Sequence, residues 1–330
     1  MIGMPSVVRG PWTREARELA AAQEAGDAFI RFFRKVMKVR NWTPWDDLPL
    51  AEMRERGHLL SEDTVTIIQA YLGIENYIGD YVREGLDLAH GQRERRNLLL
   101  AWGMEEMKHA EAWELVLVHS GRRTEEQLLE YREGLLEHKW TLREDHPGLD
   151  TSLGVICYSM LQELATYFNY EEMRKRIRRE YGLPERPTDV ERARGSEYGA
   201  AEAFRVVAND ESEHHSIFLE LVKIYLRYLP QETVTTLLKV INNFRMPAQH
   251  LIPDAPQLTD ALERTLLYTP LKYVRNVRNA VLDALGFEHK RALERAAQEA
   301  PNLPLSLAPD LVNLMRNGEF VFKAQPAASS

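Results

Sequence analysis

Residues 209–218 read NDESEHHSIF, and half of them are Asp, Glu or His. The stretch lies between two apolar segments of helical periodicity, AFRVVA before it and LELVKIYL after it. Residues three and four apart are neighbours on a helix, so one face would carry Val207, Glu211, His214 and Phe218. A carboxylate on such an apolar face is costly to bury unless it is paired or binds a metal. The stretch alone leaves open a buried ion pair, an exposed face and a metal site.

A second Glu-x-x-His motif, Glu106 to His109, lies in the segment LLLAWGMEEMKHAEAWELVLV. Its helical face is otherwise apolar, so the glutamate and the histidine again stand where core side chains belong. A third match, Glu55 to His58, lies in the short polar segment AEMRERGHLL. We interpret that third match as a chance occurrence or a turn.

Two further segments each place one carboxylate on an apolar helical face. Glu75 lies within IIQAYLGIENYIGDYV and Glu163 within VICYSMLQELATYFNY. Either alone is typical of a hydrogen-bonded core glutamate. Together the four segments carry a carboxylate, Glu-x-x-His, a carboxylate and Glu-x-x-His, the ligand set of four-helix bundles that hold two iron or manganese ions. Carboxylates and imidazole suit these ions, and two of the glutamates can bridge them.

The periodicity predicts an all-α bundle with additional flanking helices, built as one domain over residues 1–300. The metal-binding helices are expected at about 62–89, 93–119, 151–181 and 195–228, and further helices at 14–38, 124–139, 231–245 and 271–298. A polar, proline-containing segment, 182–195, is expected to be an insertion. The tail, 301–330, contains a candidate strand at 319–323, and its final residues are expected to be disordered.

Composition excludes several classes of protein. The 330 residues carry a net charge of −8 and are 44% hydrophobic, which is typical of a globular protein and argues against a nucleic-acid partner. No apolar run is long enough for a transmembrane segment, and the N-terminus lacks the apolar core of a secretion signal. The single cysteine, Cys157, excludes a disulfide framework and a cysteine-rich metal site. We expect a protein of the reducing cytoplasm.

The motifs resemble those of the soluble acyl-ACP desaturases, the type 2 fatty acid desaturases of the ferritin-like diiron superfamily. Residues 102–109, WGMEEMKH, are similar to the W-x-x-E-E-x-[RK]-H of that family. Residues 162–166, QELAT, are similar to its Q-E-x-A-T, and residues 210–214, DESEH, to its D-E-x-x-H. Residues 41–49, NWTPWDDLP, and 244–248, FRMPA, are similar to its N-W-x-P and M-P-A segments.

The resemblance implies a ferritin-like oxidoreductase of fatty acid biosynthesis and lipid metabolism. Two iron ions, for which manganese could substitute, would use O₂ and electrons from ferredoxin to desaturate a fatty acyl chain held on acyl carrier protein (ACP). The implied metal ligands are Glu75, Glu106, His109, Glu163, Glu211 and His214. His215 lies beside the ligand face and is not expected to bind metal. The family also suggests a homodimer.

The resemblance implies roles for three residues around the ligands. Thr166 matches a threonine beside the oxygen site, and Asp210 and Trp102 match a pair on an electron route. Each also has an ordinary structural interpretation. Thr166 could hydrogen-bond its own helix, Trp102 could be a core residue, and Asp210 could orient a histidine.

Basic stretches could attract the acidic ACP by electrostatic steering. One is 173–180, with Arg174, Lys175, Arg176, Arg178 and Arg179 as candidate contacts, and the others are 92–96 and 272–279. A CoA-bound substrate would suit such a patch equally well, so charge does not choose the carrier. The insertion at 182–195 could act as a lid or as a partner surface.

Several alternatives remain open. An acyl hydroxylase would share the whole ligand set. An arylamine N-oxygenase would carry a further histidine at the position of Val207. A ribonucleotide reductase small subunit would have Asp in place of Glu75, although Tyr71 and Tyr167 keep a weak form of that idea. A ferritin-like iron store is the non-enzymatic alternative, and the length of the chain disfavours it.

Overall fold

The computed structural model describes residues 13–39 and 41–302, and every regular element within these ranges is a helix. The prediction of an all-α fold is therefore confirmed for the described part of the chain. The candidate strand at 319–323 and the C-terminal end lie outside the described residues. No helix in the described ranges combines the length and apolar character needed to cross a bilayer.

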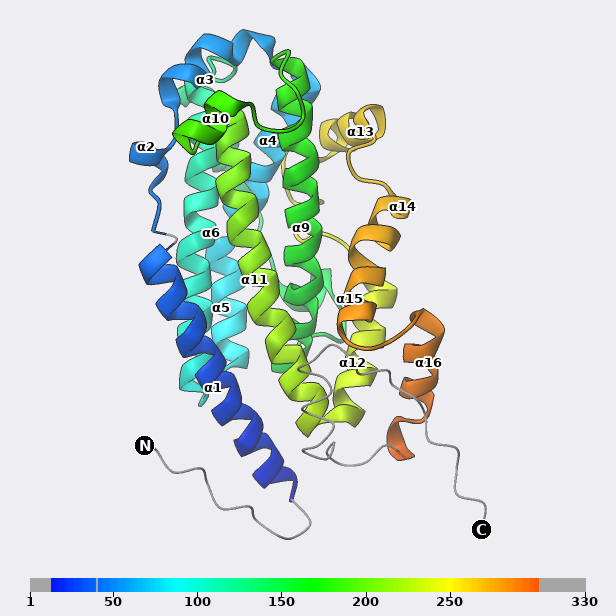
Figure 1. Cartoon of the computed structure of the whole chain (residues 1–330). Coiled ribbons are helices and arrows are strands. Elements are labelled where there is room, and N and C mark those ends of the chain that lie inside the picture. The colour runs from blue at the N-terminus through cyan, green and yellow to red at the C-terminus, as the bar shows by residue number, and fades with distance from the viewer. Residues whose placement is uncertain (1–12, 40, 303–330) are drawn as a thin grey trace.

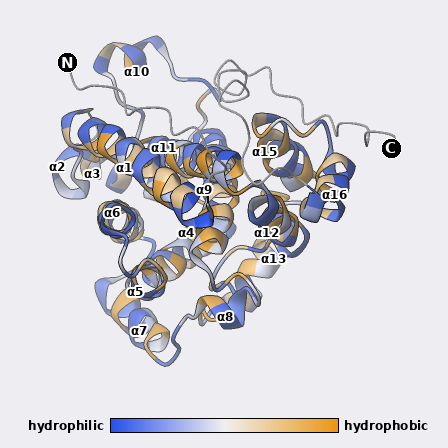
Figure 2. Ribbon diagram, turned by 90° about the horizontal axis from the view of Figure 1, so that it is seen from below, coloured by the Kyte–Doolittle hydropathy of each residue, from blue (hydrophilic) through white to orange (hydrophobic). Residues whose placement is uncertain are grey.

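Five long helices form the bundle (Figure 1). They are α4 (Glu62–Glu75), its continuation α5 (Ile78–Leu88), α6 (Arg93–His119), α9 (Ser152–Glu180) and α11 (Ala200–Tyr228). Outside them, α1 (Arg14–Val39) packs along α6 and α11. On the side away from α6 lie α12 (Pro230–Asn243), α15 (Asn279–Ala284) and α16 (Lys290–Gln298), as Figures 1 and 2 show.

Shorter elements connect the long helices. They are α2 (Pro44–Asp47), α3 (Leu50–Arg56), η1 (Gly57–Leu59), α7 (Glu125–Leu135), α8 (Leu142–Asp145), α10 (Asp189–Arg194), α13 (Ala255–Thr265), α14 (Pro270–Lys272), the π-helical η2 (Tyr273–Arg278) and η3 (Ala300–Asn302). Side-chain caps fix where several helices begin. The hydroxyls of Ser61 and Thr151 accept hydrogen bonds from the first turns of α4 and α9, and Thr124 forms a capping box with Gln127 in α7.

The helix expected over 62–89 is interrupted at Asn76 and Tyr77, directly after Glu75. The carbonyl of Leu72 accepts a hydrogen bond from the Asn76 side chain at 2.7 Å, and the carbonyl of Ile74 accepts one from the Tyr81 hydroxyl at 3.0 Å. Side chains that occupy backbone carbonyls break the helical ladder at this point. The break places Glu75 at a helix end in the middle of the bundle.

Other expected boundaries differ as well, and the helix predicted over 124–139 ends at Leu135. The helix predicted from residue 195 begins at Ala200, because Gly195 and Gly199 adopt positive φ values of 75° and 56°. The helix predicted over 271–298 is divided into α14, η2, α15 and α16, with a turn between Ala284 and Lys290. The insertion also contains a short helix, α10, which was not predicted because the segment is polar throughout.

The buried apolar residues form two clusters stacked along the bundle. One contains Trp102 of α6, Ala165 of α9 and Phe218 of α11. The other contains Trp113 of α6 and Tyr170 of α9, further along the same helices. The three helices pass from one cluster to the other, and the polar motifs lie where they cross. Apolar burial on both sides therefore fixes the motifs in position.

Candidate metal centre

Six polar side chains meet at the boundary between the two apolar clusters. They are Glu75 at the end of α4, Glu106 and His109 on α6, Glu163 on α9, and Glu211 and His214 on α11. Each is at most 7% exposed. These are the six residues that the sequence analysis expects as metal ligands, and the fold brings all of them together.

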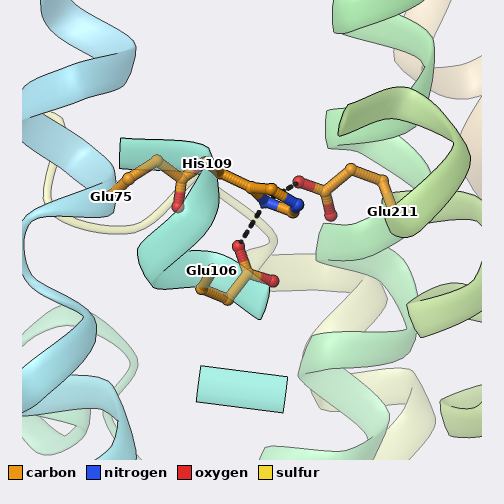
Figure 3. A group of neighbouring side chains, drawn as sticks. All are labelled: Glu75, Glu106, His109 and Glu211. Carbon is orange, nitrogen blue, oxygen red and sulfur yellow. Dashed lines mark hydrogen bonds and ion pairs between the residues drawn. The ribbon is translucent and has the colours of Figure 1, made fainter. Parts of the chain in front are cut away.

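The side chains form two groups that share two glutamates. One group is Glu75, Glu106, His109 and Glu211, and the other is Glu106, Glu163, Glu211 and His214, with the ligand atoms of each group within 4.8 Å of one another. In the first group, drawn in Figure 3, His109 Nδ1 lies 3.0 Å from Oε2 of Glu106 and 3.3 Å from Oε1 of Glu211. His214 Nδ1 lies 3.1 Å from Oε1 of Glu106 and 3.7 Å from Oε2 of Glu211. Each shared glutamate thus turns one oxygen toward each histidine, as a bridging ligand would.

The charges in this site are unbalanced. Burial raises the pKa of Glu75 and Glu163 well above the usual carboxyl value, and the other ligand carboxylates raise it further. Burial acts in the same direction on Glu106, but His109 and His214 outweigh it and hold the pKa of Glu106 below its usual value. Burial would lower the pKa of both histidines, but the carboxylates around them raise it well above the usual value. When all six groups are ionised, the four ligand carboxylates outnumber the two imidazolium rings.

Several ligand atoms are buried without a hydrogen bond to the described chain. They are Oε1 of Glu106, Oε2 of Glu163, both carboxylate oxygens of Glu211 and Nδ1 of His214. Buried polar atoms almost always have a partner, and five atoms without one converge in this site. Two divalent cations would satisfy these atoms and would balance the four carboxylates. The donor set therefore fits a dinuclear iron or manganese site.

The Nε2 atom of each histidine lies close to an acidic side chain of the other motif's helix. His109 Nε2 lies 3.4 Å from Oδ2 of Asp210, and His214 Nε2 lies 3.0 Å from Oε2 of Glu105. Such a partner fixes the ring so that Nδ1 faces a metal. Asp210 was predicted from the sequence, whereas Glu105 was not. The available signal was the acid that directly precedes the ligand glutamate in both motifs.

Asp210 also accepts a hydrogen bond from Nε1 of Trp42, in the N-W-x-P segment, at 2.8 Å. Lys108 Nζ lies 3.7 Å from Asp210 and 4.8 Å from the centre of the Trp42 ring. Trp102 instead donates its Nε1 hydrogen to Oε1 of Glu163 at 3.1 Å. Asp210 and Trp102 are thus bonded to different metal-site groups, and Trp42 is the indole hydrogen-bonded to Asp210.

Thr166 lies beside a small cavity that reaches the metal-site residues. The cavity has a volume of about 30 Å³, and its walls include Glu75, Glu106 and Thr166. The Thr166 hydroxyl donates to the carbonyl of Gln162 at 2.9 Å, so it bonds its own helix while lining the cavity. The ordinary structural role and a position beside the site therefore coexist.

A tyrosine that the sequence analysis did not select contacts a ligand. The Tyr170 hydroxyl donates to Oε1 of Glu75 at 2.6 Å, and Tyr71 packs edge-on against Tyr170 with ring centres 5.0 Å apart. Tyr170 lies two turns after Glu163, a spacing that could have identified it. His215 Nδ1 hydrogen-bonds the carbonyl of Met160 at 2.7 Å, so it is engaged away from the ligand groups.

Arg178 lies in the interior, not on a docking surface. Its side chain is 0% exposed and its Nη1 lies 2.7 Å from Glu191 and 2.9 Å from Glu197. It also donates to the carbonyls of Pro184 and Arg186 at 2.7 and 3.0 Å. We call this set the Arg178 cluster. It anchors the insertion, and its geometry argues against a partner-binding role for Arg178.

The other four cations of that stretch have acidic partners too. Arg174 pairs with Glu171, Lys175 with Glu172, Arg176 with Glu180 and Arg179 with Glu185. Only the Arg179 side chain is more than half exposed, at 55%. Because its basic residues are paired, segment 173–180 presents less free positive charge than its sequence alone suggests.

Comparison with known proteins identifies a family and similar structures. The family model described as fatty acid desaturase matches residues 40–328. A protein described as an acyl-ACP desaturase, DesA2 of Mycobacterium tuberculosis, shares the fold with a TM-score of 0.53 at 14% identity, over 84% of this chain and 99% of that one. An R2-like ligand-binding oxidase from Sulfolobus acidocaldarius matches with a TM-score of 0.49 at 14% identity, over 86% of this chain and 93% of that one.

No curated protein matches the sequence. The family model nevertheless covers most of the chain, including every motif and both ligand groups. The buried glutamates and histidines are compatible with the diiron site typical of that family. The chain therefore belongs to the type 2 fatty acid desaturases, the family of the acyl-ACP desaturases.

Proposed function

We propose that the protein catalyses the O₂-dependent desaturation of a saturated fatty acyl chain carried on ACP. The observation that carries this proposal is the pair of buried ligand groups that share Glu106 and Glu211. Bound there, two iron ions would supply the oxidising chemistry that removes two hydrogens from an unactivated hydrocarbon chain. Glu75 and His109 would complete one ion's ligands, and Glu163 and His214 the other's.

An apolar path beside the ligands supports an alkyl substrate. The cavity at Thr166 shares four wall residues, Tyr81, Trp102, Gln162 and Pro247, with a second cavity of about 40 Å³. That second cavity is lined further by Leu99, Trp140 and Val155. Such walls would orient methylene groups by packing and would exclude water from the reacting carbons. The side chains between the two cavities would rotate when a chain enters.

Electrons would come from ferredoxin through the surface side of His109. A hollow of about 410 Å³ is lined by Trp42, Asn209 and Asp210. From it, hydrogen bonds link Trp42 to Asp210 and Asp210 to His109. This chain of contacts takes over the electron role that the sequence analysis gave to Trp102 and Asp210. Trp102, bonded to Glu163, would instead position that ligand.

The acidic ACP would dock on the basic segment at 272–279. Neither Arg275 nor Arg278 forms an ion pair with a described residue, whereas Lys272 pairs with Glu172 at 2.9 Å. Tyr273 of the same segment stacks on Phe244, with ring centres 4.9 Å apart. Phe244 leads into the segment whose Met246 lines the cavity at the ligands. Carrier and active site would thus be close.

The outer faces of α1 and α6 support a homodimer. Exposed apolar side chains follow both helices: Ile30, Phe33 and Met37 on α1, and Leu100, Met104 and Met107 on α6. A second copy would remove them from water. The enzyme would act in a reducing cytoplasm, where its one thiol, the buried Cys157, needs no partner.

A mass-resolved turnover assay tests the proposed function. Iron-loaded protein, ferredoxin, its reductase, NADPH and a ladder of saturated acyl-ACPs would be incubated in air. A product lacking two hydrogens supports desaturation and identifies the preferred chain. A product with one added oxygen would make the protein a hydroxylase.

Two further results would contradict the proposal. Turnover with acyl-CoA but not with acyl-ACP would overturn the carrier, and no acyl product with either would overturn the desaturase activity. The iron content separates the enzyme from a store, since a dinuclear enzyme saturates at two ions per chain, whereas an iron store takes up many.

A further inference from the structure

The apolar path continues beyond the two cavities of the acyl site. A third cavity, of about 10 Å³, shares Gly85, Leu99 and Val155 with the second. Its walls also include Leu98, Phe218 and Arg95. The three cavities therefore lie in series from the ligands toward the beginning of α6. An alkyl chain that follows them from the ligands passes Glu84 in the second cavity and reaches Arg95 in the third.

Arg95 separates this inner path from a much larger groove. The groove has a volume of about 630 Å³, lies between α1, α6 and α11, and shares Arg95 and Leu98 with the third cavity. The Arg95 guanidinium donates to the Tyr225 hydroxyl and lies 5.1 Å from the centre of that ring. An arginine can line an apolar space with its stem while its head meets a wetter one. Arg95 occupies such a boundary.

The groove could hold more of an alkyl chain if the boundary were opened. Its apolar walls include Leu19, Ala22, Phe29 and Leu221. Burial lowers the pKa of Arg95 to about 10, and no carboxylate of the described chain offsets that effect. The hydroxyl and ring of Tyr225 are thus the contacts that hold the guanidinium across the path. Either side chain could be shortened without removing a salt bridge that the described residues form.

The boundary also lies at a defined distance from the ligands. Arg95 and Glu106 are on the same helix, and a helix rises about 1.5 Å per residue, so they are separated by roughly 16 Å along α6. An extended alkyl chain could span that distance. A wall at this position would stop a chain at a fixed distance from the metal ligands.

We propose that Arg95 and Tyr225 form the end wall of the acyl cavity and determine the longest chain that the protein accepts. The inference rests on the proposed function, because it supposes that an acyl chain occupies the cavities in series. It goes further by assigning specificity to one side-chain pair and by identifying the groove as the space into which a longer chain would extend.

Binding of free saturated fatty acids, from lauric to behenic acid, tests the wall without turnover. Displacement of a fluorescent fatty acid from the iron-loaded full chain would give an affinity for each length. In Arg95→Ala the groove becomes continuous with the cavities, so the tightest-binding acid should become longer. Each added methylene that enters the groove should tighten binding about fourfold. In the wild type, affinity should stop rising at the shorter length.

Two further variants make the result specific. Arg93→Ala removes an exposed cation from the same helix, and Arg93 lines neither the cavities nor the groove, so it should keep the wild-type profile. Val155→Phe fills the path between the second and third cavities and should shift the preference to shorter acids. This opposite shift keeps the inference testable if Arg95→Ala folds poorly.

The outcomes separate the two proposals. Equal length profiles in the wild type, Arg95→Ala and Val155→Phe would overturn the end wall while leaving a fatty-acyl site intact. A shift in Arg93→Ala as large as that in Arg95→Ala would also overturn it, because surface charge would then be the cause. Absence of fatty acid binding in every protein would contradict the proposed function itself, and the wall with it.

Discussion

The Arg178 cluster and the metal centre are both buried and charged, and they differ in how completely their atoms are bonded. In the Arg178 cluster every guanidinium nitrogen has a partner: Nε bonds the Pro184 carbonyl, Nη1 bonds Glu191 and Glu197, and Nη2 bonds Glu191 and the Arg186 carbonyl. In the metal centre, carboxylate oxygens of Glu106, Glu163 and Glu211 are buried without a hydrogen bond to the described chain.

The difference shows why burial alone does not identify a site. Both clusters are almost fully excluded from water, and both contain glutamates. In the Arg178 cluster only Oε1 of Glu197 lacks a hydrogen bond to the described chain, both carboxylates pair with the guanidinium, and the cluster joins α9 to the insertion. The metal centre is incomplete, since its carboxylates outnumber its cations and its free atoms converge. Convergent atoms without partners indicate a ligand that the chain itself does not supply.

The largest expected effect is the loss of bound iron when a ligand of the metal centre is replaced. Glu106→Ala removes a ligand from both groups, so the variant should lose both irons while keeping its helical content. His214→Ala removes a ligand from one group and should lose at least one iron. Metal analysis together with circular dichroism measures both quantities. Retention of two irons in either variant would contradict the ligand assignment.

The third Glu-x-x-His match supplies the control for this experiment. Glu55 and His58 have the same spacing as the ligand motifs, but both are exposed. Glu55→Ala and His58→Ala should keep two irons per chain. Metal loss in these variants would mean that the Glu-x-x-His spacing, and not its buried position, accounts for iron binding.

Breaking the other cluster should affect stability and not metal. Arg178→Met leaves the Glu191 carboxylate buried without its cation and leaves Glu197 only Arg174, 3.5 Å away, which costs about 3–5 kcal/mol of unfolding free energy. Denaturant unfolding of the apoprotein measures this loss, and iron content should stay at two per chain. An exposed pair of the same helix, Arg179 with Glu185, offers the control, since Arg179→Met should cost at most about 1 kcal/mol.

Neutralising one glutamate in each cluster should have opposite effects on the apoprotein. Glu163→Gln removes a carboxyl whose ionisation is opposed by burial and by the other ligand carboxylates, so it should stabilise the metal-free protein by about 1 kcal/mol while weakening iron binding. Glu191→Gln weakens a charge-assisted hydrogen bond to Arg178 and should destabilise by about 1–3 kcal/mol. Melting temperatures of the two apo variants test the contrast. If both substitutions changed the melting temperature in the same direction, the clusters would not differ as described.

The sequence predicted the ligand constellation because its signal is local. Glu106 with His109, and Glu211 with His214, repeat one spacing on helices whose other residues are apolar. Periodicity fixes which residues share a face, and the order of the four motifs then indicates a bundle. Glu105 was harder to assign, because its bond to His214 joins two helices and depends on how they pack.

The features that the sequence did not predict depend on individual side-chain contacts. The break after Glu75 requires the Tyr81 hydroxyl to reach the Ile74 carbonyl, which periodicity does not encode. Trp42 bonds Asp210 across 168 residues of chain, so its place near His109 could not be derived from spacing. Arg178 looked like surface charge because its acidic partners follow it in the insertion.

The smallest expected effect is a pH dependence confined to the Arg178 cluster. Burial alone would raise the pKa of Glu191, but hydrogen bonds from Arg178 and Thr188 lower it from 4.5 to about 2. A lowered folded-state pKa stabilises the protein above the unfolded value, and this contribution is lost as the pH falls from about 4.5 to about 2. Amide exchange of α10 should therefore accelerate across that window. In Glu191→Gln the acceleration should be absent, whereas Glu185→Gln, at the exposed pair, should retain it. Unchanged acid sensitivity in Glu191→Gln would mean that the anchor of the insertion does not depend on this carboxylate.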